Sequence, residues 1–260
     1  MPFRKKRFTK KGKGMKKRIQ RLENQLTPLM KTFEQRFGDY ISNSQSVPLS
    51  GYVADLGQMC PTLQSGGTAI TNANIRLGDK ITLKSIWIKG EITVGFGVAG
   101  DTDNRMRLLL VRMPEYRQGA SNTEIIQKVL QQYDGGATGS IIPSYAAQYS
   151  PYKNVITLQN AVPMEKYEVL YDKQFNLFNN LQAQAPATTP SGVSGASTKE
   201  NWRHNFSINV KFPKGLVCQY SKPLSDIPDL NNLLLLGVSD SSLPNHPVIR
   251  YCSRVKYMDA

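Results

Sequence analysis

The chain has few of the residues on which disulfide-stapled domains and metal sites depend. Its 260 residues include only two histidines and three cysteines, Cys60, Cys218 and Cys252. An odd number of widely separated cysteines does not form a disulfide framework, and it fits a reducing compartment. No two of these residues have the spacing of zinc ligands. We therefore expect neither a disulfide scaffold nor a metal cofactor.

Long apolar segments are also missing. The longest apolar run is 233–236, followed by Val238 beyond a glycine. It is far shorter than the roughly 20 residues that a membrane-spanning helix needs. Met1 leads into charged residues, without the apolar segment of a signal peptide. The sequence thus predicts a soluble intracellular protein with no membrane partner.

Acidic residues are absent from the first 21 positions, which carry eleven lysines and arginines. The whole chain has 33 basic and 19 acidic residues, a net charge of +14. Without residues 1–21 there remain 22 basic against 19 acidic residues, or +3. Most of the charge therefore lies in one short arm attached to a nearly neutral body. Such an arm is suited to a polyanion.

The arm is the strongest candidate binding site in the sequence. Each cation can neutralise a phosphate and release a counterion, and two interleaved phenylalanines can stack on unpaired bases. A segment without fixed geometry cannot read base edges, so we expect binding that is sequence-tolerant and strongly salt-dependent. The predicted nucleic-acid-binding residues are Phe3, Arg4, Lys5, Lys6, Arg7, Phe8, Lys10, Lys11, Lys13, Lys16, Lys17, Arg18 and Arg21.

Two other roles for the arm stay open. RKKR and KKR, about eight residues apart, resemble a bipartite nuclear import signal. That role is compatible with nucleic-acid binding. A membrane-surface role is less favoured, because aromatic residues are few and no lipidation signal follows Met1.

The segment behind the arm has a helical pattern. Two glycines within residues 1–18 favour disorder there in the free protein. Over 19–37, apolar residues recur every three or four positions, which predicts an amphipathic helix kinked at Pro28 and ended by Gly38. The helix could pack on its own body or associate with copies of itself. The stripe consists of Ile19, Leu22, Leu26, Leu29, Phe33 and Phe37.

The rest of the chain has the alternation of β-strands. The parity of the apolar residues changes around Ser85–Ile88, which suggests a bulge, a bend or burial of both faces there. We also expect a helix over 122–132 capped by Ser121 or Asn122, and an exposed loop over 182–200. Strands without regular intervening helices argue against a parallel α/β sheet. The predicted fold is all-β: an eight-stranded jelly-roll sandwich of two antiparallel sheets over 47–260. Strands are expected at 52–56, 80–98, 105–113, 155–158, 166–178, 202–212, 233–238 and 248–258.

Catalytic signatures are weak. The sequence has neither a phosphate-binding glycine loop of Walker type nor a Gly-x-Ser-x-Gly nucleophile motif. Glu168 and Asp172 share a parity typical of a solvated strand face, and His204 falls on an apolar face where a core histidine is expected. Nothing suggests general acid–base chemistry, so we expect a protein that is not an enzyme.

One loop has the alternating oxygen ligands of a calcium site. Asp101, Asp103 and Asn104 have a suitable spacing, but the EF-hand pattern would need glutamate where Arg112 stands. A solvated turn is favoured, and a calcium ion at a subunit contact stays open.

Four stretches carry a resemblance to a known family: GDKITLKSIWIKGEITVG (78–95), NRMRLLLVRMPEYRQG (104–119), NVITLQNAVPMEKYEVLYDKQFNL (154–177) and NNLLLLGVSD (231–240). They resemble segments of the capsid proteins of small circular single-stranded DNA viruses that encode a replication initiator. The first two are similar to the early jelly-roll strands of those proteins, the third to a mid-capsid segment and the fourth to a late strand. Geminiviruses and satellite tobacco necrosis virus share this fold. The Cys/His element of some geminivirus coats is not found here.

The resemblance implies a structural protein that self-assembles into an icosahedral shell of about 60 copies (T=1) and packages single-stranded DNA. Sixty arms would carry roughly 660 positive charges inside the shell. The implied locations are the virion and, during assembly, the host nucleus. The predicted helix would bundle at a three-fold or five-fold axis, and loop 182–200 would lie outside. The alternatives are a non-viral, sequence-tolerant nucleic-acid-binding protein with a β-sandwich body and an enzyme with a basic localisation arm.

Overall fold

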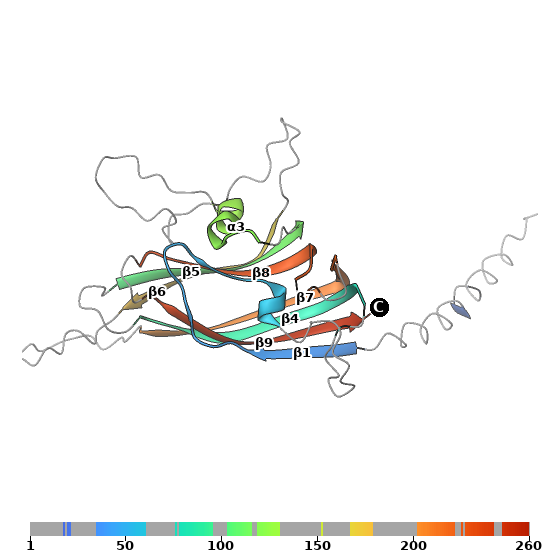
Figure 1. The fold of residues 1–260 in the computed structure, drawn as a ribbon. Coiled ribbons are helices and arrows are strands. Elements are labelled where there is room, and N and C mark those ends of the chain that lie inside the picture. Colours follow the sequence, from blue (N-terminus) through green and yellow to red (C-terminus); the bar gives the residue numbers. More distant parts are fainter. Residues whose placement is uncertain are drawn as a thin grey trace, which may run out of the picture.

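The computed structural model is a mostly-β fold with a large antiparallel sheet and a few short helices (Figure 1). It describes residues 18, 20–21, 35–60, 76, 78–95, 103–115, 119–130, 152, 167–178, 202–221, 225, 227–241 and 246–259. The strands are β1 (Gln35–Ile41), β2 (Gln45–Ser46), β3 (Tyr52–Ala54), β4 (Lys80–Thr93), β5 (Asp103–Glu115), β6 (Glu168–Phe178), β7 (Arg203–Gln219), β8 (Leu230–Ser239) and β9 (Val248–Asp259). Two helices, α2 (Leu56–Met59) and α3 (Asn122–Val129), lie between strands in the sequence.

The long strands pair in a nested pattern. The first pairs with the last, β1 with β9, and inward along the chain β3 pairs with β8, β4 with β7 and β5 with β6. Every pair is antiparallel. The central pair, β5 and β6, therefore behaves like the end of one long hairpin whose outer arms are β1 and β9. Further pairs between β4 and β9 and between β5 and β8 connect the nested pairs side by side.

The resulting sheet has the order β1-β9-β4-β7-β8-β5-β6, with β3 also paired to β8. We call β1, β9, β4 and β7 the β9 half, and β3, β8, β5 and β6 the β8 half. One residue pair, Gln219 with Leu230, joins the two halves. The sequence predicted two separate sheets, whereas the described strands form one continuous sheet. The long β7 accounts for this difference, because its last residue reaches β8.

One large apolar cluster draws side chains from both halves. Ile86 and Ile88 of β4 belong to it, together with Leu108 of β5, Leu235 of β8 and Val255 of β9, all fully or almost fully buried. In Figure 1 the strands β5 and β8 lie above β4 and β9. Burying apolar side chains stabilises the fold by roughly 25 cal/mol per Å² of surface removed from water.

The face change predicted in the first long strand is confirmed. The pairing of β4 shifts register between Leu83 and Ser85, as at a β-bulge. Leu83 before the shift and Ile86 after it are both buried, although they lie on opposite parities. The bulge therefore lets both apolar sets face one core, and Trp87 turns outward.

The β7 and β8 strands have different burial patterns. In β7, Phe206 and Ile208 are buried and the intervening Ser207 and Asn209 are exposed, as the alternation predicts. In β8, Leu234 and its neighbours are buried on both faces. A second apolar cluster explains this, because α3 covers the outer face of β8 and β5.

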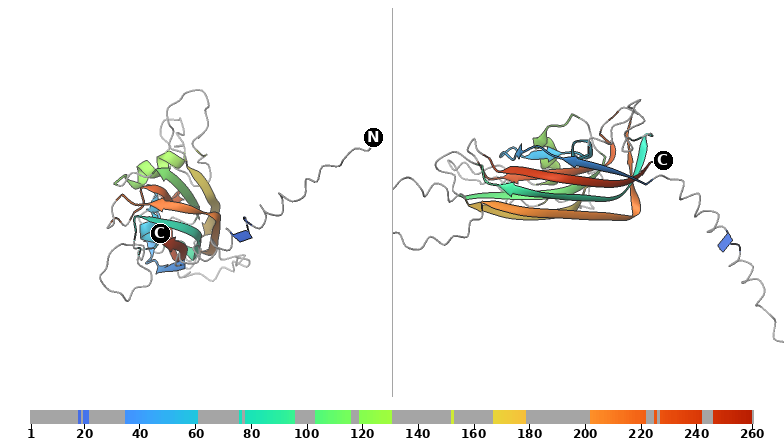
Figure 2. Two further views of the ribbon diagram at one scale, coloured as in Figure 1. Left: turned by 90° about the vertical axis from the view of Figure 1, so that its right-hand side faces the viewer. Right: turned by 90° about the horizontal axis from the view of Figure 1, so that it is seen from below.

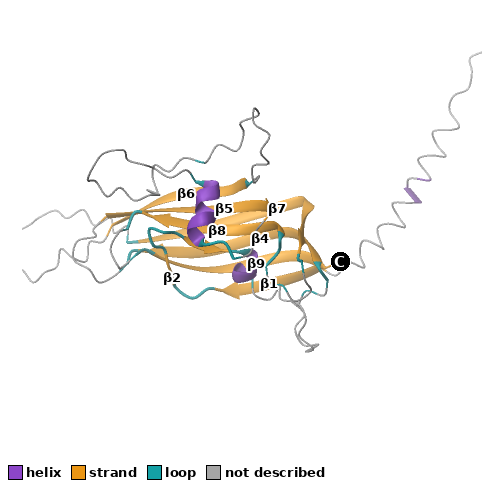
Figure 3. Cartoon of the chain, turned by 45° about the horizontal axis from the view of Figure 1, so that its top comes forward, coloured by secondary structure: helices purple, strands orange, loops and turns teal. Residues whose placement is uncertain are grey.

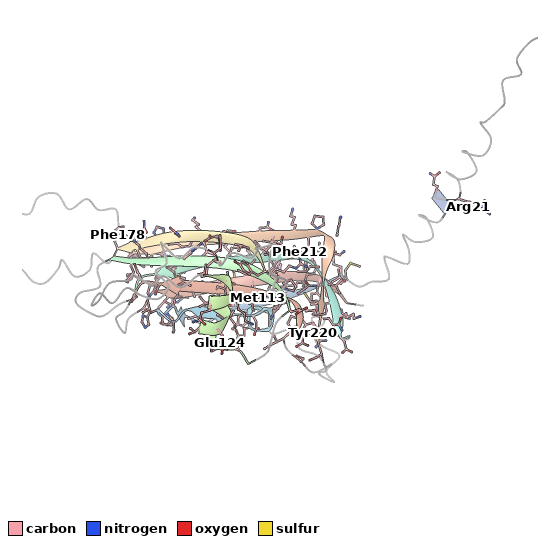
Figure 4. All side chains as sticks on the ribbon, turned by 90° about the horizontal axis from the view of Figure 1, so that it is seen from above. Arg21, Met113, Glu124, Phe178, Phe212 and Tyr220 are labelled. Atoms are coloured by element: carbon pink, nitrogen blue, oxygen red, sulfur yellow. The ribbon has the colours of Figure 1, made fainter. Side chains whose placement is uncertain are left out.

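Helix α3 confirms the predicted start of the helix expected over 122–132, but it ends at Val129, and Leu130 is already extended. Ser121 is its N-cap: the Ser121 hydroxyl accepts from the Glu124 amide, and the Glu124 carboxylate accepts from the Ser121 amide. This capping box satisfies two amides that the helix itself leaves unpaired. Ile125, Ile126 and Val129 are buried against the sheet. Figure 3 shows α3 lying across the strands of the β8 half, and Figure 4 labels Met113 of β5 close to it.

The helix predicted over 19–37 is wrong at its C-terminal end. Residues 35–37 belong to β1, and Gly38, the predicted helix stop, pairs with Val255 inside that strand. Seven residues of β1 are in register with β9, so tertiary hydrogen bonding outweighs the helical spacing of the apolar residues. Phe37, assigned to the apolar stripe, is 45% exposed. Residues 22–34 lie outside the described residues.

Other expectations fall partly or wholly outside the described residues. The strand predicted at 155–158 and the loop predicted at 182–200 are not described. Asp103 and Asn104, expected in a solvated turn, belong to β5, and Asn104 is buried. The turn interpretation is therefore wrong for these two residues, and Asp101 is not described.

Candidate nucleic-acid interface

Two of the thirteen predicted nucleic-acid-binding residues are described. Arg18 and Arg21 are helical and exposed, and Figure 4 labels Arg21. Residues three apart on a helix lie on the same side, so their charges face in one direction. The other eleven predicted residues, Phe3, Arg4, Lys5, Lys6, Arg7, Phe8, Lys10, Lys11, Lys13, Lys16 and Lys17, lie outside the described residues.

Basic side chains also gather on the body, on the outer face of the β9 half. Residues paired across antiparallel strands point to the same side of a sheet. Trp87 pairs with Asn209 on β7 and with Arg254 on β9. Figure 2 (right) shows these strands side by side. We call this surface the basic face: Phe37, Asp39, Trp87, Lys89, Glu91, Arg203, Asn209, Lys211, Arg250, Arg254 and Lys256.

The two carboxylates of the basic face are both bound by arginines. Arg254 Nε lies 2.6 Å from Asp39 Oδ1, and its Nη2 lies 2.6 Å from Oδ2. The hydrogen bond from Arg254 lowers the pKa of Asp39. Glu91 pairs with Arg203 and lies 3.9 Å from Arg250. Six cations against two acids leave a net charge of +4 on this face.

The lysines of the basic face are more open. Lys89 and Lys211 are exposed and have no ion-pair partner within the described part of the chain. The ammonium of Lys256 lies 5.5 Å from the ring centroid of Phe37. Trp87 is 36% exposed, which is unusual for a tryptophan in the middle of a long central strand. The face therefore combines uncommitted positive charge with an accessible indole ring.

A second polar cluster lies on the β8 half. Arg107 is only 6% exposed and donates from Nε and Nη2 to the two oxygens of Asp172, at 2.9 and 2.8 Å. Tyr152 donates to Asp172, and the guanidinium lies 5.0 Å from its ring centroid. Burial by itself would raise the pKa of Asp172, but the hydrogen bonds from Arg107 and Tyr152 outweigh it and lower the pKa. The carboxylate is fully engaged, which suits a structural ion pair.

The sequence prediction placed Asp172 on a solvated face, and its exposure supports that. What it missed is the partner, because Arg107 lies 65 residues away in the sequence. Arginines at both ends of an apolar strand, RMRLLLVRM, were the available signal. Only the register of β5 with β6 brings Arg107 beside Asp172.

A cavity of about 610 Å³ is lined mainly by residues between Tyr40 and Gln58, in the N-terminal part of the body. Its lining includes Tyr40, Tyr52, Asp55 and Tyr251. The Tyr52 and Tyr251 hydroxyls are 3.2 Å apart, and burial raises the pKa of both. Asp55 accepts from the Gln58 amide as the cap of α2. The cavity thus offers neutral hydroxyls and a carboxylate already used as a helix cap.

The histidine and cysteine side chains that the sequence raised as candidates for catalysis or metal binding are in environments typical of structural residues. His204 has the hydrogen-bonded ring that was expected, with Nε2 2.8 Å from the Asn176 carbonyl oxygen and the ring near Phe175. It is only half-buried, however, and lies at the margin of the core instead of inside it. Burial raises the pKa of Cys218 to about 12, so its thiol stays protonated. The three cysteines are free. Among the described residues, no three His, Cys, Asp or Glu side chains cluster as metal ligands would.

None of the helices in the described ranges is long and apolar enough to span a bilayer. No protein-family model matches this chain, and no curated protein matches it in sequence.

Proposed function

We propose that this chain is a viral capsid protein that assembles into a small icosahedral shell and packages single-stranded DNA through its N-terminal arm. The observation that carries the proposal is the charge distribution: eleven cations and no acids in 21 residues, attached to a body of net charge +3. In a closed shell this arm becomes an interior lining, because its charge is multiplied by the copy number. About 60 arms then offset a large part of the self-repulsion of a short genome.

The strand order supports a jelly roll as the finer description of the fold. Without the two-residue β2, the eight strands counted in chain order pair as 1 with 8, 2 with 7, 3 with 6 and 4 with 5. Wrapping such a nested hairpin gives two four-stranded groups, 1-8-3-6 and 2-7-4-5, which are the β9 and β8 halves. The shared core cluster is what two stacked sheets would produce. We infer that the halves are the two sheets of a jelly-roll sandwich.

The role proposed for the body is structural. The described cavity is lined by neutral tyrosines and a capping aspartate. Both oxygens of the Asp172 carboxylate accept hydrogen bonds from Arg107. Neither arrangement provides a free base beside a nucleophile. The locations proposed are the virion and the host nucleus, the latter through the basic motifs of the arm.

The experiment that tests this function is sizing chromatography of the purified chain at low and high salt, followed by electron microscopy. A capsid elutes as a megadalton species that carries nuclease-protected nucleic acid and shows closed particles. A 29.1 kDa monomer under all conditions would overturn the proposal. Sequencing the protected nucleic acid identifies it as DNA or RNA.

Two arm variants separate assembly from packaging. Deletion of residues 1–21 is expected to leave shells that contain no nucleic acid, because the body supplies the fold. A matched variant keeps the length of the arm and replaces its eleven lysines and arginines by glutamine. Both variants are expected to behave alike if charge is the active property. Packaging by the glutamine variant would contradict the electrostatic mechanism.

A second candidate is favoured by one observation, the net charge of +4 on the basic face. A non-viral, sequence-tolerant nucleic-acid-binding protein would need basic surface on its body as well as on its arm. Such a protein would bind nucleic acid as a monomer or small oligomer. The same chromatography experiment decides between the candidates by particle size.

A further inference from the structure

We propose that the basic face of the body is a second binding site for single-stranded nucleic acid, with Trp87 as a base-stacking platform and Lys89, Lys211 and Lys256 as phosphate contacts. This inference rests on the nucleic-acid partner of the proposed function. It adds a fixed surface to the arm, and so gives the nucleic acid a defined place on each subunit.

The register places the three lysines around the indole. Lys211 and Lys256 are both in register with Ser85, which is two residues before Trp87 on β4. Lys89 is two residues after it. Two residues along a strand span roughly 7 Å, and neighbouring strands lie roughly 5 Å apart. Cations therefore lie on both sides of the ring, where a strand with one base stacked on Trp87 would bring its flanking phosphates.

The distribution of charge on the basic face favours a polyanion as its ligand. Asp39 and Glu91 are held by arginines. The register places Ser207 and Cys252 opposite Lys89, and Ser85 opposite Lys211, so no acid faces either lysine across the strands. The chain's own arm carries a charge of +11 and is repelled by a face of +4. A second basic face of another copy is excluded for the same reason. An extended phosphate backbone complements the charge, and an exposed indole accepts any base.

The topology is consistent with one continuous nucleic-acid surface. In the sequence the arm is separated by residues 22–34 from β1, which is the edge strand of the half that carries the basic face. Phe37 of β1 lies on this face beside Lys256. The arm is therefore tethered to the edge of the half that carries the basic face, and one nucleic acid strand could contact both.

Tryptophan fluorescence tests the stacking contact directly. The chain has two tryptophans, Trp87 and Trp202, and Trp202 packs partly buried against the core. Oligothymidylate is added to dissociated full-length chains, whose size is checked by chromatography. Quenching is expected for the wild type and for Trp202→Phe, and is expected to vanish for Trp87→Phe. Undiminished quenching in Trp87→Phe would overturn the stacking contact.

Affinity and its salt dependence test the site as a whole. Trp87→Ala is expected to weaken oligothymidylate binding by about 5- to 150-fold, the range for loss of one stacked base. Lys89→Gln with Lys211→Gln should reduce the slope of log affinity against log salt by about 1.4, or 0.7 for each lost phosphate contact. Lys173→Gln, an exposed lysine on β6 of the β8 half, is the matched control and should change neither quantity.

The outcomes separate this inference from the proposed function. If wild-type chains form shells that package nucleic acid, but the Trp87 and lysine variants bind oligothymidylate like wild type, the basic face is not a binding site and the capsid proposal stands. If wild-type chains form no particles but bind through Trp87, the basic face stands and the capsid proposal fails.

Discussion

The outer surfaces of the β8 half and the β9 half of the sheet differ in what covers them. The outer face of β5 and β8 carries Leu109, Leu234 and Leu236, and α3 covers it. The basic face carries lysines, arginines and one exposed tryptophan. Figure 2 (left) shows α3 on one side of the strands. The same continuous sheet thus has one part of its outer surface covered by its own chain and another part left exposed.

The same contrast holds for ion pairs. Arg107 and Asp172 meet on the β8 half, where the arginine is 6% exposed. Arg254 and Asp39 meet on the basic face, where both side chains are more than half exposed. A buried arginine that loses its partner retains an uncompensated charge, whereas an exposed one is solvated by water. The two pairs have similar geometry and unequal structural importance.

The largest expected change in stability distinguishes the apolar outer face of β5 and β8, which α3 covers and which we call the apolar face, from the basic face. Leu236→Ala removes a fully buried side chain of the second apolar cluster and is expected to lower the free energy of unfolding by about 2–5 kcal/mol. Asn209→Ala, on the exposed basic face, should stay within about 0.5 kcal/mol of wild type. Urea unfolding followed by fluorescence measures both. Equal losses would mean that the basic face is also packed.

The next effect compares the two ion pairs. Asp172→Asn leaves the Arg107 guanidinium without its carboxylate, and we expect a loss of about 1–3 kcal/mol in the free energy of unfolding. Asp39→Asn on the basic face serves as the matched control and should have little effect. Chemical denaturation at neutral pH measures the difference between the two variants.

Lowering the pH should remove the difference in unfolding free energy between wild type and Asp172→Asn. The pKa of Asp172 is lower in the folded protein than in the unfolded chain, so its contribution is present above the unfolded value of about 4 and is lost as pH falls through the folded value. The stability gap between wild type and Asp172→Asn should therefore narrow between about pH 5 and pH 3. A gap that stays constant over this range would show that the carboxylate charge is not what stabilises the pair.

A smaller loss of stability is expected when the N-cap of α3, the helix that covers the apolar face, is removed. Ser121→Ala removes the side-chain half of the α3 capping box, and a loss of about 1 kcal/mol is expected. Ser121→Asp retains a cap acceptor and should recover most of it. Hydrogen exchange of the α3 amides reports whether the helix opens locally before the sheet unfolds. Identical exchange in Ser121→Ala and wild type would show that packing alone holds α3.

The smallest effect is expected for the lysines of the basic face. Lys89→Gln and Lys211→Gln should change stability by less than about 0.5 kcal/mol, because the side chains are exposed and have no ion-pair partner within the described ranges. Thermal unfolding of the variants measures this. A clear gain in stability would indicate that the folded body tolerates these charges at a cost, as expected of residues kept for binding.

Local patterns predicted much of the described fold. Strict alternation identified β7, the parity change located the bulge of β4, and the cap candidates Ser121 and Asn122 identified the start of α3. Each of these signals lies within a dozen residues. The failure at β1 has the opposite origin. The three- and four-residue spacing up to Phe37 favours a helix, but β1 is formed by pairing with β9, more than 200 residues later.

The candidate site shows the same division between local and distant information. The sequence alone determined a polycationic arm of 21 residues and a nearly neutral, β-rich body, because charge and alternation are properties of the chain itself. Individual strands already revealed outward-facing cations such as Lys211 and Arg254. Only the tertiary structure decided that they share a face with Trp87, because strand register is set by hydrogen bonding between segments far apart in the chain. The sum of +3 for the body concealed this, since a net charge contains no information about which side of a sheet each residue occupies.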